Sequence, residues 1–159
     1  FIMSGCASYN PIPEGYSGQK ASIQDSALEQ SSQKADFFYV ESVDGHDIEN
    51  SVIVTSQANR GRGFSMTPKT IGREIPARLT TLKIVGRTVY AAPILDLTNT
   101  VYQVKGNIQF TPEANKFYTI KGELGESYSA VWVEEYGVGA VAGTKIEIRG
   151  SAKLGTFEK

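Results

Sequence analysis

The sequence predicts an all-β protein built as an antiparallel β-sandwich, with an Ig-like or transthyretin-like architecture. About eight to ten short runs rich in β-branched and aromatic residues alternate with turn signals, and no stretch carries convincing helical periodicity. The connections are too short for helical crossovers, which favours antiparallel pairing of neighbouring strands. A β-barrel of about eight strands is the alternative architecture.

The N-terminal half contains both strand and loop signals. Phe37-Phe38-Tyr39-Val40 is apolar on both faces, which is typical of a central strand, and it leads into the tight-turn signal Asp44-Gly45. The Ser/Gln-rich segment 25–34 and the segment 92–99 are expected to be loops. The predicted strands of this half cover residues 20–25, 37–40, 47–55, 77–85 and 88–90, with Pro76 marking an edge or strand start and an irregularity expected at Gly86-Arg87.

The C-terminal half alternates more clearly. From Tyr102 to Phe110, apolar and polar side chains alternate with period two, which indicates a half-buried antiparallel strand. Val131-Trp132-Val133 is apolar on both faces and indicates another central strand. The remaining predicted elements are strands at 118–124 and 127–136, a loop at 137–143 and a last strand around Ile146 and Ile148.

Composition limits the domain count and the class of partner. The chain has 159 residues and a formal net charge of −1. A chain of this size forms one domain and buries a core without a metal or disulfide, and its near-neutral charge leaves no nucleic-acid partner expected. The predicted parts are a signal-peptide remnant at 1–5, a lipidated N-terminus and tether at 6–19, the β-sandwich at 20–150 and a polar C-terminal tail at 151–159.

The first six residues, Phe1-Ile2-Met3-Ser4-Gly5-Cys6, are an apolar run, two small residues and the only cysteine. Met3-Ser4-Gly5-Cys6 resembles the lipobox of bacterial lipoproteins, with Met3 in place of the more typical leucine. The resemblance implies cleavage before Cys6 and attachment of fatty acyl chains, such as palmitate, to its thiol and freed amine. Ala7 in place of aspartate implies sorting to the outer membrane, with the domain facing the periplasm or the cell surface. A buried free cysteine is the alternative for Cys6.

A second resemblance concerns the domain. Phe110–Tyr118 and Ala130–Glu135 are similar to segments of small β-sandwich lipoproteins in Gram-negative envelopes. The similarity covers about a quarter of the chain, as judged from these two segments and their surroundings. It implies the sandwich fold and carries no catalytic residues.

Motifs typical of catalysis are incomplete. His46 is the only histidine, and a zinc site or catalytic triad needs further groups, so no metal or cofactor is predicted. Gly137–Lys145 lacks the residue order of a phosphate-binding loop. Arg60–Phe64 resembles a fragment of an arginine-glycine nucleic-acid segment, although a solvated loop is the simpler interpretation. Glu134-Glu135 offers paired carboxylates for a hydrolase, which is the weakest functional hypothesis.

Aromatic residues give the most specific candidate binding site. Tyr128, Trp132 and Tyr136 share one face of a predicted strand and can form a stacking platform for sugars, although the same face alternatively packs in the core. We expect a non-enzymatic, lipid-anchored interaction or structural module that contacts an envelope protein, with strand addition at a sheet edge as the docking route. A glycan- or peptidoglycan-binding module that uses this aromatic face is the alternative.

Overall fold

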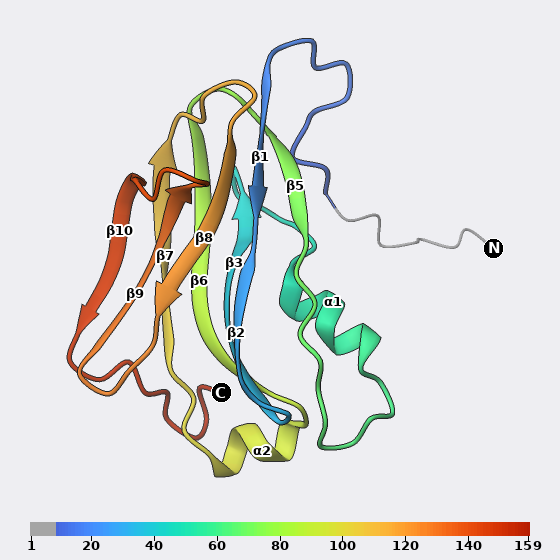
Figure 1. Ribbon diagram of the computed structural model, residues 1–159, viewed down its shortest axis with the longest axis vertical. Helices are drawn as coiled ribbons and strands as arrows, with labels where there is room; N and C mark the ends of the chain where they lie inside the picture. The colour runs from blue at the N-terminus through green and yellow to red at the C-terminus, as the bar shows by residue number, and fades with distance from the viewer. Residues whose placement is uncertain (1–8) are drawn as a thin grey trace.

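The computed structural model describes residues 9–159, which form two five-stranded sheets packed face to face (Figure 1). The sheets do not close into a barrel, so the β-sandwich prediction is confirmed and the barrel alternative is wrong. Two short helices, which the sequence did not predict, accompany the sheets.

The first sheet has the strand order β10-β9-β8-β1-β5. Its members are β10 (Val141–Arg149), β9 (Tyr128–Glu135), β8 (Phe117–Glu123), β1 (Lys20–Gln24) and β5 (Gly72–Pro76). Neighbouring strands are antiparallel except β1 and β8, which are parallel. The prediction of antiparallel pairing rested on short connections between strands that follow one another in sequence. It does not hold for β1 and β8, because these strands are far apart in sequence and no hairpin joins them.

The second sheet has the order β2-β3-β6-β7, and β4 pairs with the end of β3. All of its pairs are antiparallel. Its members are β2 (Ser26–Ser31), β3 (Lys34–Val43), β4 (His46–Asp47), β6 (Thr80–Tyr90) and β7 (Gln103–Phe110).

The main core lies between the two sheets. Inward-facing residues alternate with outward-facing ones along each strand, so both sheets contribute one apolar face. The largest fully buried members include Phe38, Ile84 and Ile120. A second, smaller core lies on the opposite face of β3 and β6 and is made of Ala35, Phe37, Tyr39, Met66 and Val85.

Helix α1 (Ser51–Ala58) occupies part of the segment 47–55, so the strand prediction there was wrong. The run Val52-Ile53-Val54 favours a strand, but local contacts start a helix. The side chain of Asn50 accepts hydrogen bonds from the N–H groups of Val52 and Ile53, at 3.1 and 3.2 Å. The partly buried Val52 packs against the second core.

The two predicted loops are also partly regular structure. Most of segment 25–34 is strand β2, whose polar, exposed side chains suit a strand at a sheet edge. Helix α2 (Pro93–Thr98) lies in segment 92–99 and begins with Pro93, whose fixed φ fits the first turn of a helix.

Both ends of the described chain lie against the sandwich. The ring of Tyr9 stacks on His46 with 4.1 Å between ring centroids, and Pro11 is buried. At the other end, the N–H of Leu154 donates to the carbonyl of Val101 at 2.8 Å, and Ala152 is buried. The predicted tail 151–159 is therefore held more firmly than its polar composition indicates.

Candidate open-face groove

One face of the sandwich carries no helix. Both helices contact the second sheet, α1 at β3 and α2 at β6. No helix lies over the outer face of the sheet formed by β5, β1, β8, β9 and β10, and we call this surface the open face (Figure 1). A sheet face of this kind is available for binding because only its inner side chains are needed for the core.

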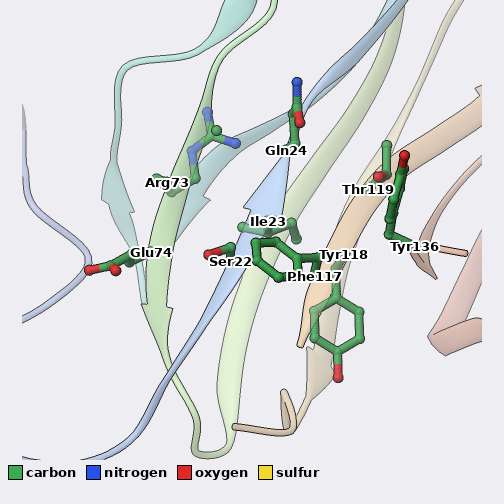
Figure 2. Close-up of a pocket in the computed structure, with 10 residues that line it drawn as sticks. Ser22, Ile23, Gln24, Arg73, Glu74, Phe117, Tyr118, Thr119 and Tyr136 are labelled. Carbon is green, nitrogen blue, oxygen red and sulfur yellow. The ribbon is translucent and has the colours of Figure 1, made fainter. Parts of the chain in front are cut away.

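The open face is hollowed by a groove of about 530 Å³ over β5, β1 and β8. Figure 2 shows Phe117 near Ser22, and Tyr136 beside Thr119. The lining residues come from three adjacent strands and from the residue that follows β9; they are Ser22, Ile23, Gln24, Gly72, Arg73, Glu74, Phe117, Tyr118, Thr119 and Tyr136.

Two aromatic side chains in the groove are strongly exposed. Phe117 is 64% exposed and Tyr136 is 74% exposed, although large apolar rings are normally buried. They stand on adjoining backbone, because the N–H of Tyr136 donates to the carbonyl of Phe117 at 2.9 Å, and Figure 2 shows their two rings apart on the groove. Two exposed rings on adjoining backbone form an apolar surface that a flat ligand can cover.

Polar side chains lie in register beside the rings. Ser22 is paired with Glu74 on one side and Phe117 on the other. Gln24 is paired with Thr119 of β8 in the same way. Within residues 9–159, the side chains of Ser22, Gln24 and Thr119 make no hydrogen bond to the protein, so their donors and acceptors are free for a ligand.

A buried ion pair supports the edge of the groove. Arg73 lines the groove, and its guanidinium donates two hydrogen bonds to the carboxylate of Asp25, at 2.5 and 3.0 Å. The same carboxylate accepts from the N–H groups of Val40 and Ser51 and from the hydroxyl of Ser51. Asp25 thereby ties β5, β3 and the start of α1 to the corner where the chain passes from one sheet to the other.

The predicted aromatic platform is only partly assembled. Tyr128, Trp132 and Tyr136 do point to the open face, and none is in the core, so the core alternative was wrong. Only Tyr136 lines the groove. The ring of Trp132 is covered by the Lys145 ammonium, 4.1 Å from the ring centroid. The hydroxyl of Tyr128 donates to Glu147, and this hydrogen bond raises the pKa of Tyr128.

The other sequence candidates do not form a site. His46 stacks on Tyr9, and no group of three or more metal-binding side chains occurs in the described residues. Glu134 accepts a hydrogen bond from the Trp132 indole, whereas Glu135 pairs with Lys116, so these two neighbouring carboxylates do not converge.

Two further candidate segments have structural roles. Arg62 donates to the side chains of Asn59 and Thr67 and thereby holds its own loop. Of the glycine-rich segment 137–145, the part from Val141 onward is strand β10, which rules out the helix that a phosphate-binding loop precedes.

Cys6 lies outside the described residues. In the part of the chain that is described, no helix has both the length and the apolar character needed to cross a membrane.

Sequence reasoning missed Phe117 and the polar side chains beside it. The available signal was the alternation around Tyr118 and Ile120, which places Phe117 and Thr119 on the opposite, outward face. The pairing of β1 with β8, which brings Ser22 and Gln24 beside them, has no local signal because the two strands are distant in sequence.

The fold and the groove define a two-sheet sandwich with one open face that carries a groove with two exposed aromatic rings. Comparison with protein-family models, with curated proteins and with solved structures finds no match to this chain.

Proposed function

We propose that this chain is a lipid-anchored, non-enzymatic module of a bacterial envelope that binds a glycan in the open-face groove. The observation that carries the proposal is the pair of exposed rings, Phe117 and Tyr136, beside polar side chains without hydrogen bonds in the described chain. This combination favours the glycan-binding alternative over contact with an envelope protein.

The chemistry of sugars matches the groove. A sugar ring has apolar C–H faces that stack on aromatic rings, and hydroxyls around its rim that need hydrogen-bond partners. Phe117 and Tyr136 supply the first, and Ser22, Gln24 and Thr119 supply the second. We assign no hydrolysis to the groove because Glu74 is the one carboxylate among its lining residues, whereas glycoside hydrolysis ordinarily uses two.

The anchor is supported by the similarity of Met3-Ser4-Gly5-Cys6 to a lipobox. Acyl chains contribute about 0.8 kcal/mol per buried CH₂, so two or more chains at Cys6 give stable attachment. In cells that express the full precursor, Cys6→Ser is expected to move the protein from the membrane fraction to the soluble fraction. Retention of the variant in the membrane fraction would contradict the anchor.

Binding is tested by titration calorimetry with soluble peptidoglycan fragments and a set of plant and bacterial oligosaccharides. The double variant Phe117→Ala and Tyr136→Ala is expected to bind the glycan at least about tenfold more weakly. Each sugar ring stacked on an aromatic side chain contributes on the order of 1 kcal/mol to the binding free energy. Phe64→Ala is the matched control, because Phe64 is 57% exposed but does not line the groove. Equal binding by both variants, or no binding by the unmodified protein, contradicts the proposal.

A further inference from the structure

We propose that the glycan is acidic, and that Trp132, Lys121 and Lys145 form a subsite for a carboxylate-bearing sugar unit next to the groove. This inference rests on the proposed function and adds the chemical class of the ligand. It follows from the geometry of β8, β9 and β10 on the open face.

The three side chains are neighbours on adjacent strands. Lys121 is the register partner of Trp132 across the β8–β9 ladder. Lys145 of β10 places its ammonium 4.1 Å from the centroid of the Trp132 ring. The two lysines therefore belong to the strands on either side of β9, and the partly buried Trp132 lies between them in the sheet.

The subsite continues the groove. On β8, Thr119 lines the groove and Lys121 is the next residue on the same face. Trp132 of the neighbouring strand β9 precedes Tyr136 by four residues, which corresponds to about 13 Å of extended backbone. A ligand longer than a single sugar ring can therefore contact both the groove and the Trp132 subsite.

The charges of the open face leave these lysines available. Lys20 of β1 and Lys116, which precedes β8, each lie within 4 Å of a carboxylate, at 3.5 and 2.9 Å. No such ion pair involves Lys121 or Lys145 in residues 9–159.

Two nearby carboxylates accept hydrogen bonds from neutral donors, which fix their positions and leave their charge in place. The carboxylate of Glu134 accepts from the Trp132 indole N–H at 3.1 Å, and that of Glu147 accepts from the Tyr128 hydroxyl. Glu123 remains on the same face, but it is paired across the ladder with Ala130 rather than with Trp132.

These contacts explain how an acidic sugar unit is held. The hydrogen bond to Glu134 fixes the orientation of the indole, so its face is presented in one position. An ammonium over an aromatic ring at an exposed site contributes about 0.5–1 kcal/mol, which a bound carboxylate can replace by an ion pair. Movement of Lys145 from the ring to the carboxylate then exposes the indole face for stacking.

The test compares oligogalacturonates with their methyl esters by titration calorimetry, since both have the same sugar rings and only the first carry charge. We expect methyl esterification to weaken binding about tenfold, because two exposed ion pairs contribute roughly 1.4 kcal/mol together. Raising the salt concentration should weaken binding of the acid but not that of the ester.

Lys121→Gln and Lys145→Gln are each expected to reduce affinity for the acid about three- to fivefold and to leave affinity for the ester unchanged. Lys105→Gln is the matched control, because Lys105 is an exposed lysine on β7 of the other sheet. Equal affinity for acid and ester overturns the inference, as does unchanged binding of the acid by both lysine variants. If both forms bind equally and the Phe117/Tyr136 variant weakens both, the proposed function stands and only this inference falls. If neither form binds, this inference falls, and the proposed function falls with it only when no other oligosaccharide of the set binds.

Discussion

At the scale of single residues, Asp25 organises more of the molecule than any groove residue does. Its carboxylate is fully buried and accepts hydrogen bonds from Arg73, Val40 and Ser51. Removing one partner of a buried ion pair leaves the other charge without compensation, which costs far more than losing an exposed pair. The position of Arg73 at the edge of the groove therefore depends on Asp25, which is buried and does not line the groove.

Asp25→Asn is expected to lower the free energy of unfolding by about 3 kcal/mol, because Arg73 keeps its charge while its partner becomes neutral. Urea denaturation followed by circular dichroism measures this loss. The control is Lys20→Gln, which removes the exposed Lys20–Glu74 pair and should cost less than about 1 kcal/mol. Equal losses for the two variants would mean that the buried pair has no special role.

Burial of Tyr39 makes the unfolding free energy depend on pH in the alkaline range. Its side chain is buried in the second core, and this burial, with a smaller contribution from the Glu41 charge, raises the pKa of Tyr39 from 10.0 to about 12. The folded state thus favours the neutral phenol. The resulting stabilisation is complete below pH 10 and is lost as the pH rises from about 10 to about 12.

We expect the unfolding free energy of the unmodified protein to fall by roughly 2 kcal/mol more than that of Tyr39→Phe over this interval. Urea denaturation of both proteins at about pH 8, about pH 10 and about pH 11.5 measures the difference. Parallel pH profiles for the two proteins would show that Tyr39 does not titrate in this way.

At the scale of elements, most strands were predictable and the helices were not. Alternation of apolar and polar side chains identified β7, β8 and β10, whereas the apolar run Val131-Trp132-Val133 identified β9. Helix α1 was missed because its β-branched residues favour a strand, and the cap at Asn50 that decides the matter is a single side chain. Strand β2 was missed because edge strands in contact with solvent need no apolar pattern.

Asn50→Ala is expected to destabilise the protein by about 1 kcal/mol, because the N–H groups of Val52 and Ile53 lose their acceptor. Hydrogen exchange should speed up first in α1. The control Ser56→Ala replaces an exposed side chain within the same helix and should change stability by less than about 0.5 kcal/mol. Unchanged exchange in α1 of the Asn50 variant would argue against the cap.

Gly122 of β8 allows the two sheets to approach. A Cβ atom at this position would lie 2.3 Å from the ring of Phe38 and 2.5 Å from the carbonyl of Ala130. Gly122→Ala should therefore lower the unfolding free energy by about 2 kcal/mol through overpacking. Glu123→Ala, on the exposed face of the same strand, is the control. A fully stable Gly122→Ala protein would contradict the close packing.

At the scale of the whole molecule, the two sheets have different outer surfaces. The second sheet buries a small core beside α1, whereas the first has no helix on its outer face (Figure 1) and exposes Phe117 and Tyr136 there. The sequence indicated Tyr136 as a candidate because strand periodicity places it on the same face as Tyr128 and Trp132. It did not find the groove, because Phe117, Ser22 and Glu74 meet through pairings between strands that are far apart in the chain.

The measurement that tests the central claim most directly is backbone-amide chemical-shift mapping by NMR with the tightest-binding glycan. We expect the largest shifts on the groove strands, at residues 22–24, 72–74, 117–119 and 136, with α1 and β7 unaffected. Shifts concentrated on α1 or β7, or an absence of shifts at saturating glycan, would contradict a glycan site on the open face.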